Sequence, residues 1–156
     1  MRLTITERSN LSDLFFERVA ASPKAQAYRQ FRDGVWVDTQ WEQVARVVGR
    51  WQAGLRSAGL KSGDRVGICS RNRLEWVLFD QAALGLGLVT VPLFYNDRPG
   101  NMAWCLNDAG ARVLLLDKID ALQKGRLSEV RQRIEKIKRQ KSAAGARNTK
   151  YGILIS

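Results

Sequence analysis

The alternation of apolar and polar residues along the chain predicts an α/β protein. Between residues 61 and 117, three short apolar runs alternate with two segments whose apolar residues recur at helical spacing. The runs lie in Lys61–Cys69, Leu88–Pro92 and Arg112–Leu116, and the helical segments are Asn72–Leu84 and Pro99–Ala109. Strands and helices in this order predict right-handed βαβ units and a short parallel sheet with helices on both faces.

The residues before this alternation predict a helix followed by a small antiparallel hairpin. Ser12 is the expected N-cap of the helix, because its hydroxyl can accept a hydrogen bond from a free backbone N–H group. Asp33 and Gly34 separate two runs in which apolar and polar residues roughly alternate, Ala25–Phe31 and Val35–Asp38. An Asp-Gly pair in this position is a strong hairpin signal, because glycine accepts the positive φ that a tight turn needs.

A second helix is predicted directly after the hairpin. Thr39 and Glu42 have the spacing of a capping box, in which each side chain satisfies a free backbone N–H group. Apolar residues follow at helical spacing as far as Ala58, and Gly59 is the expected left-handed stop.

The composition changes after Asp117. Of the net charge of +11, residues 1–117 contribute 15 basic and 12 acidic side chains, whereas residues 118–156 contribute 11 basic and 3 acidic ones. Apolar residues at spacings of three and four predict a basic amphipathic helix over residues 128–140, and the small polar residues 141–150 predict disorder. We therefore divide the chain into a body, residues 1–117, and a basic helical or disordered tail, residues 118–156.

The residue types present exclude several classes of site. The chain has no histidine, which excludes Ser-His and Cys-His nucleophile pairs, histidine bases and histidine-containing metal sites. Cys69 and Cys105 are predicted to be buried thiols in a reducing compartment, with a disulfide between them as the alternative. The first ten residues lack the apolar run of a secretory signal, and no stretch reaches the roughly 20 apolar residues of a membrane span. The expected location is the cytoplasm, with the inner face of the membrane as the alternative.

Two features resemble binding motifs, but the sequence favours a structural role for each. Gly85-Leu-Gly87 lacks the third glycine of a dinucleotide fingerprint and ends a predicted helix instead of opening one, which indicates a turn. Asp117 follows a predicted parallel strand, where α/β folds often place functional groups, and is interpreted as the start of a helix.

Four charged residues are further candidates for a functional role. Arg71 and Arg73 follow a predicted strand and are candidates for contact with an anion, but solvated surface residues are the favoured interpretation. Glu75 and Asp80 are five positions apart on one predicted helix and do not form a facing pair, which argues against acid–base chemistry.

Six stretches of the body match known motifs in order and spacing: Thr39–Val44, Gly63–Ile68, Asn72–Trp76, Gly85–Pro92, Phe94–Pro99 and Cys105–Arg112. Over residues 10–117 the chain thereby resembles the N-terminal part of an AMP-forming acyl-CoA synthetase, most of all a long-chain fatty acid CoA ligase of the adenylate-forming superfamily. The resemblance implies part of the N-terminal subdomain of that fold, in which these motifs are scaffold.

The resemblance also implies a reaction. Enzymes of this family use ATP and Mg²⁺ to convert a fatty acid to an acyl-adenylate, and then transfer the acyl group to coenzyme A. Their phosphate loop, a Ser/Thr/Gly-rich run that ends in Pro-Lys, has no counterpart here, nor do the adenine-pocket motif, the ribose-binding aspartate and the catalytic lysine. We therefore assign no catalytic, cofactor-binding or metal-ligating residue, and expect this ligase-family chain to bind none of these cofactors and to be inactive alone.

Several alternatives stay open at this point. A sheet that stops after the third strand would expose an edge, through which the body would pair with itself or with a synthetase chain, and would leave apolar surface uncovered. The tail is a solvated helix or poorly folded junction, a foreign sequence introduced by a frameshift or fusion, or a binding segment in which residues 118–150 contact nucleic acid or anionic lipid.

Overall fold

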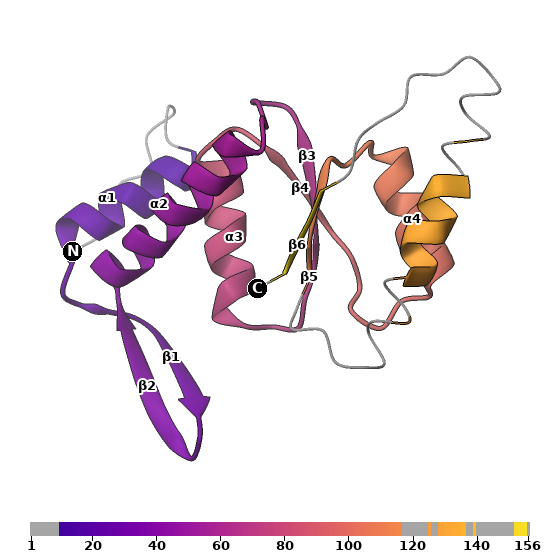
Figure 1. Cartoon of the computed structure of the whole chain (residues 1–156). Helices are drawn as coiled ribbons and strands as arrows, with labels where there is room; N and C mark the ends of the chain where they lie inside the picture. Colours follow the sequence, from indigo (N-terminus) through magenta and orange to yellow (C-terminus); the bar gives the residue numbers. More distant parts are fainter. Residues whose placement is uncertain (1–9, 117–124, 126–127, 137–138, 140–151, 156) are drawn as a thin grey trace. The chain divides into compact units, whose positions relative to one another are not determined.

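The computed structural model describes residues 10–116, 125, 128–136, 139 and 152–155 (Figure 1). The chain divides into two compact units. Unit 1 comprises Met1–Ser62 and Leu74–Gly87, and unit 2 comprises Gly63–Arg73 and Leu88–Ser156. Neither unit is therefore continuous in sequence, because residues 63–73 of unit 2 lie between the two parts of unit 1.

The described residues of unit 1 form three helices and a hairpin. The helices are α1 (Leu11–Ala21), α2 (Trp41–Ser57) and α3 (Leu74–Leu84). Val44, Val48 and Leu55 of α2 are completely buried, as is Phe79 of α3, whose ring meets Trp51 edge to face at 5.4 Å between centroids. The apolar faces of α2 and α3 thus form the core of this unit, and α3 begins two residues later than the predicted Asn72.

The cap of α1 differs from the prediction. Asn10, not Ser12, precedes the helix with extended backbone angles, φ −109° and ψ 172°. Its side-chain Oδ1 accepts a hydrogen bond from the backbone N–H of Asp13 at 3.0 Å. Ser12 lies inside the first turn, where its backbone is already helical, so the prediction of a Ser12 cap is wrong.

The hairpin consists of β1 (Gln26–Arg32) and β2 (Val35–Gln40), paired antiparallel. Asp33 and Gly34 both have positive φ, 50° and 82°, as a two-residue type I′ turn requires. Phe31 and Trp36 form a cross-strand pair with ring centroids 5.3 Å apart. The Asp-Gly turn prediction is confirmed.

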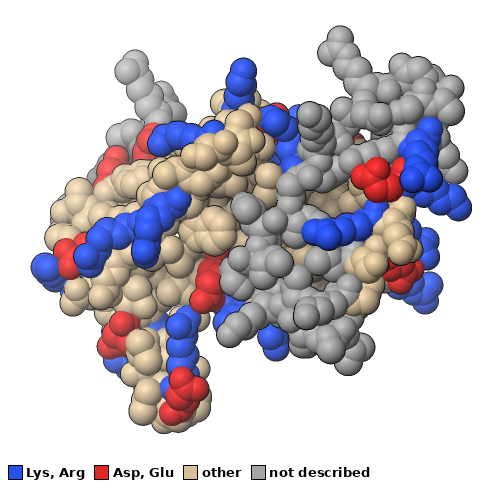
Figure 2. Space-filling model, in the orientation of Figure 1, with Lys and Arg blue, Asp and Glu red and all other residues tan. Residues whose placement is uncertain are grey.

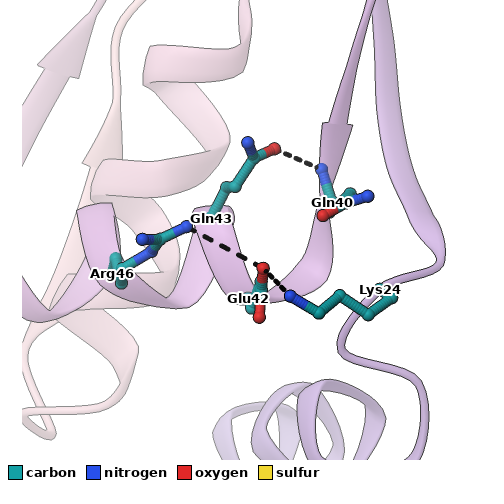
Figure 3. Close-up of polar contacts among 5 residues, drawn as sticks. All are labelled: Lys24, Gln40, Glu42, Gln43 and Arg46. Carbon is teal, nitrogen blue, oxygen red and sulfur yellow. Dashed lines mark hydrogen bonds and ion pairs between the residues drawn. The ribbon is translucent and has the colours of Figure 1, made fainter.

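The start of α2 also differs from the prediction (Figure 3). Thr39 lies within β2, opposite Tyr28, so strand pairing keeps it out of the predicted capping role. The N-cap is Gln40, whose backbone N–H donates to Oε1 of Gln43 at 2.8 Å. The capping box is therefore shifted by one residue, and the helix begins two residues later than expected.

Glu42, in the first turn of α2, holds two cations. Its Oε1 accepts a hydrogen bond from Nζ of Lys24 at 2.8 Å and lies 3.9 Å from Arg46 (Figure 3). The hydrogen bond from Lys24 is the largest cause of a lowered pKa at Glu42, against a smaller opposing effect of desolvation. The predicted motif residue Glu42 thus links the start of α2 to the chain before the hairpin.

Unit 2 is built on a parallel sheet in the order β4-β3-β5-β6. Its strands are β3 (Arg65–Cys69), β4 (Val89–Pro92), β5 (Val113–Leu116) and β6 (Gly152–Ile155), and α4 (Pro99–Asp108) connects β4 to β5. The three predicted strands and the predicted helix are confirmed. The fourth strand was not predicted, and it contradicts the expectation that the sheet stops after the third one.

The core of unit 2 includes residues from the segment that was interpreted as a tail. Residues 128–136 are helical, as is residue 139, which confirms the predicted helix over the part that the structure describes. Val130 and Ile134 are only 2% and 7% exposed. They share one apolar cluster with residues of β3, α4, β5 and the loop between α4 and β5, namely Cys69, Met102, Ala103, Leu106, Ala111 and Leu114. An entirely solvated helix is therefore the wrong description of this segment.

Candidate functional site

The carboxyl edge of the parallel sheet is where an α/β fold would place a ligand site. Beyond β3, Ser70 is 7% exposed and its Oγ donates a hydrogen bond to the backbone carbonyl of Arg71 at 3.0 Å. The Arg71 guanidinium lies over the ring of Tyr95, which follows β4, at 5.5 Å from the ring centroid. This cation–π contact joins the two loops, so the described role of Arg71 is structural. Arg73 is partly buried, contrary to a purely solvated interpretation.

The motif Gly63–Ile68 begins at the opposite end of the sheet and continues along β3. Asp64 and Arg112 form an ion pair, which joins the residue before β3 to the residue before β5. Arg65 donates from Nε to the carbonyl of Ala109 at 2.7 Å, and from its Nη atoms to the carbonyls of Gly63 and Gly110 at 3.1 and 3.4 Å. The Arg65 side chain therefore fastens the C-terminal end of α4, where free carbonyl groups favour a cation.

Replacing Arg65 with methionine is expected to lower the free energy of unfolding by about 1–3 kcal/mol, because hydrogen bonds from a charged donor are lost while the apolar stem remains. Urea-induced unfolding, followed by circular dichroism, measures the change. Arg50→Met is the matched control, since Arg50 is exposed on α2. Equal effects of the two substitutions would contradict the fastening role of Arg65.

The two carboxylates considered for acid–base chemistry belong to α3. Glu75 accepts a hydrogen bond from Nη2 of Arg32 at 3.1 Å, which ties the hairpin to α3 within unit 1. Asp80 is partly buried on the same helix. Gly85 ends α3 through its N–H bond to the carbonyl of Gln81, and Gly87 has a φ of 66°, so the predicted turn is confirmed.

Among the described residues, the remaining candidates form neither a disulfide nor a metal site. Cys69 is buried and Cys105 partly buried, and both are free thiols, so the disulfide alternative is wrong. Asp117 lies outside the described residues. Among the residues that the structure describes, no three His, Cys, Asp or Glu side chains come together as metal ligands. None of the described helices has the length and apolar character of a membrane span.

The network of Asp64, Arg65 and Arg112 is the arrangement that sequence reasoning missed. Its three members are charged residues at or just before the start of a strand, and nothing in their spacing distinguishes them from surface residues. The signal that was available is their occurrence in two of the matched motif stretches. This network neutralises opposite charges and caps the end of a helix. These contacts position the strands.

Comparisons with known proteins agree with this architecture. Residues 15–152 match the family described as AMP-binding enzyme. The chain is 35% identical over 114 residues to long-chain-fatty-acid–CoA ligase FadD15 of Mycobacterium tuberculosis, which covers 73% of this chain and 19% of that protein. It is 30% identical over 118 residues to an uncharacterized Mycobacterium tuberculosis protein, covering 74% of this chain and 66% of that one.

Solved structures show the same fold. A Mycobacterium tuberculosis fatty acyl CoA synthetase aligns with a TM-score of 0.74 at 22% identity, over 94% of this chain and 26% of that one. The N-terminal domain of FACL13 from the same organism aligns with a TM-score of 0.70 at 24% identity, over 78% of this chain and 29% of that one. The chain thus spans about a fifth of the length of the FadD15 ligase that it matches.

The family match continues through residue 117, where the sequence analysis placed the end of the body. The buried residues Val130 and Ile134 and the strand β6 lie beyond that position. These observations argue against a foreign origin of residues 118–152, whereas a functional division of the chain at residue 117 stays a prediction.

Proposed function

Because the chain belongs to the AMP-binding enzyme family, we propose that it forms the first part of the N-terminal domain of a long-chain fatty acid CoA ligase. The family reaction would use ATP and Mg²⁺ to adenylate a fatty acid, and coenzyme A to accept the acyl group. The observation that carries this proposal is the match of residues 15–152 together with the similarity to FadD15. Fatty acid, ATP and coenzyme A are thus the ligands proposed for the complete enzyme.

The role proposed for this chain's own residues is to build the scaffold. We propose that the described residues supply no nucleotide, magnesium or coenzyme A site of their own. At the carboxyl edge of the sheet, the Arg71 guanidinium is stacked on Tyr95. The 156 residues contain no Ser/Thr/Gly-rich run ending in Pro-Lys that would cradle a triphosphate. No reaction step is therefore derived from these residues.

The scaffold role has a physical basis in the sheet. Parallel strands place their carboxyl ends along one edge, which is where α/β enzymes bind ligands. The ion pair between Asp64 and Arg112 and the hydrogen bonds of Arg65 fix the opposite edge, together with the end of α4. The chain would thus hold part of a ligand-binding edge in place without contributing the groups that contact ATP.

An assay of ATP–pyrophosphate exchange tests the first half of the proposal. The purified chain, incubated with palmitate, ATP, Mg²⁺ and labelled pyrophosphate, is expected to show no exchange above a protein-free control. A full-length ligase of the family serves as the positive control. ATP–pyrophosphate exchange activity that co-purifies with the chain through every step would contradict the proposal that the chain is inactive alone.

A chimaera tests the scaffold role directly. Residues 10–155 replace the matching N-terminal segment of FadD15, and the chimaera is expected to keep adenylation activity. The same chimaera carrying Gly67→Val, which places a side chain where Gly67 packs against Leu106, is the control and is expected to lose it. A folded chimaera without activity would show that this segment is not equivalent to the family scaffold.

The alternative is a non-enzymatic module that pairs with a synthetase chain or with itself. One observation favours it: within the described residues, β6 is paired on one side only, at the edge of the sheet. Size-exclusion chromatography of the chain with a full-length ligase discriminates the two. Elution as a complex would favour the module, and separate monomers would count against it.

A further inference from the structure

The turn of the β1–β2 hairpin is open to solvent. Every residue from Phe31 to Asp38 is exposed. Figure 1 shows the hairpin projecting from the helices of unit 1, and Figure 2 shows acidic groups at its free end. Among the described residues, β1 and β2 pair only with each other. A ribbon of two strands is marginally stable in water, so its tip can open locally while the helices stay folded.

The two residues of this turn form a pair that occurs once in the chain. Asp33 precedes Gly34, and no other aspartate or asparagine in the sequence is followed by a glycine. Asp33 has a φ of 50°, in the left-handed region that residues with a side chain rarely adopt. Its carboxylate forms no hydrogen bond or ion pair with a described residue. The Asp33 side chain is therefore free to rotate about its own backbone.

The backbone nitrogen of Gly34 is equally accessible. A Cβ built on Gly34 would have no atom within 4 Å, so nothing crowds this residue. The ribbon is closed by the pairing of Arg32 with Val35, and the N–H of Gly34 makes no hydrogen bond to the backbone of a described residue. A bond from this nitrogen to Cγ of Asp33 would close a five-membered ring. The turn thus brings together an unrestrained carboxyl group and an unengaged nitrogen.

We propose that Asp33 is a site of spontaneous isomerisation to isoaspartate. The Gly34 nitrogen attacks Cγ of the protonated Asp33 carboxyl group and forms an N–Cγ bond, and the hydroxyl of that group leaves as water with the proton of the nitrogen. Water then opens the resulting succinimide ring. Cleavage of the new N–Cγ bond restores aspartate, whereas cleavage of the original peptide bond leaves the chain linked through Cγ. One water is released and one is taken up, so the reaction needs no other reactant.

Isomerisation changes the backbone of the turn. Isoaspartate adds Cβ to the main chain and leaves the α-carboxylate as a side group. A two-residue turn matches the twist of its flanking strands only with the ordinary backbone spacing, so the inserted atom disturbs the pairing beside it. Phe31 and Trp36 form the cross-strand pair next to the turn, with ring centroids 5.3 Å apart. The modification therefore loosens the contact between these two rings.

Ageing of the whole folded chain in mildly acidic buffer, followed by peptide mapping, tests the proposal. Trypsin cuts after Arg32 and Arg46 and releases a peptide that begins with Asp33. A second chromatographic peak of the same mass is expected to accumulate with time, and electron-transfer fragmentation should place the altered linkage at Asp33. An isoaspartyl carboxyl methyltransferase with labelled S-adenosylmethionine should label the aged chain and not the fresh one. Asp108, exposed and followed by alanine, is the internal control and should stay unchanged.

A variant and an unfolded reference complete the test. Asp33→Gly keeps a residue that accepts positive φ but removes the carboxyl group, so labelling should fall to the level of the fresh chain. A urea midpoint equal to that of the unmodified chain confirms that this variant is folded. The chain unfolded in urea gives the rate of an unrestrained Asp-Gly pair, and the folded chain is expected to isomerise at a rate of the same order. The proposal is overturned if only the unfolded chain gains isoaspartate, if neither does, or if labelling persists in Asp33→Gly.

Discussion

Gly67→Ala is expected to lower the free energy of unfolding by about 1–3 kcal/mol, the usual cost of forcing extra atoms into a packed core. Gly67 lies in the central region of β3, and its missing side chain leaves room for its neighbours. A Cβ at this position would be 2.6 Å from Cδ2 of Leu106 and 2.9 Å from Cδ1 of Leu114. Both leucines are nearly completely buried, so neither can turn its methyl group into solvent.

The sign of this effect makes the prediction specific. Alanine usually stabilises a helix or strand relative to glycine by about 0.5–1 kcal/mol, because alanine loses less conformational entropy than glycine when the chain folds. Gly49→Ala on the exposed side of α2, where no atom lies within 4 Å of the new Cβ, should show that ordinary gain. Urea unfolding of the two variants provides the comparison, and a stabilised Gly67→Ala variant would show that α4 does not pack closely on β3.

A double substitution locates the origin of the effect. Leu106→Ala alone creates a cavity and is also expected to destabilise the chain. Combined with Gly67→Ala, it removes the atom that the new Cβ meets first, so the two effects should be less than additive. Strict additivity would place the strain elsewhere.

Ile134→Ala is expected to lower the free energy of unfolding by about 2–5 kcal/mol, the range for removing a buried isoleucine side chain. Ile134 is 7% exposed and belongs to the same cluster as Met102 and Leu106 of α4. The effect arises because the segment at residues 128–136 covers the core of unit 2 and is not a solvated appendage. Thermal or urea unfolding measures it.

The neighbouring Gln132 provides the control for this prediction. Gln132 is exposed on the same helix, so Gln132→Ala changes a side chain without opening a cavity. Its effect should remain within about 0.5 kcal/mol, as for most surface substitutions. If Ile134→Ala were equally mild, the segment would not be part of the folded core.

The order of elements in the body could be predicted from sequence because each signal is local. Asp33-Gly34 specifies a hairpin turn through the φ angles that it accepts, and the apolar periodicity of α2 specifies its buried face. The caps were predicted less well. Asn10 and Ser12 are nearly equivalent cap residues, and only the conformation of the surrounding chain decides between them.

Tertiary pairing explains the elements that local signals missed. Thr39 has good capping chemistry, but its pairing with Tyr28 in the hairpin holds it in an extended conformation. The strand β6, Gly152–Ile155, is too short to be distinguished by pattern after a long polar stretch, and its identity depends on pairing with β5. The burial of Val130 follows in the same way from contact with residues distant in sequence.

For the candidate site as well, features set by local sequence could be predicted and features set by tertiary pairing could not. The predicted turn at Gly85 and the free cysteines depend on residue type and neighbours, and were correct. The network around Asp64, Arg65 and Arg112 depends on two strands lying side by side, which no spacing within one segment reveals. Long-range charge pairs of this kind require the fold before they can be recognised.

The strand order β4-β3-β5-β6 has a consequence for synthesis of the chain on the ribosome. The hairpin in unit 1 can close as soon as it emerges, because its two strands are adjacent in sequence. By contrast, β3 is translated before both of the strands that flank it, although it lies inside the sheet. Until β5 has been made, the side of β3 that will pair with it, at the apolar residues Val66 and Ile68, has no partner strand. An interior strand of the finished sheet is therefore the one that stays accessible to chaperones and to misassembly for longest while translation continues.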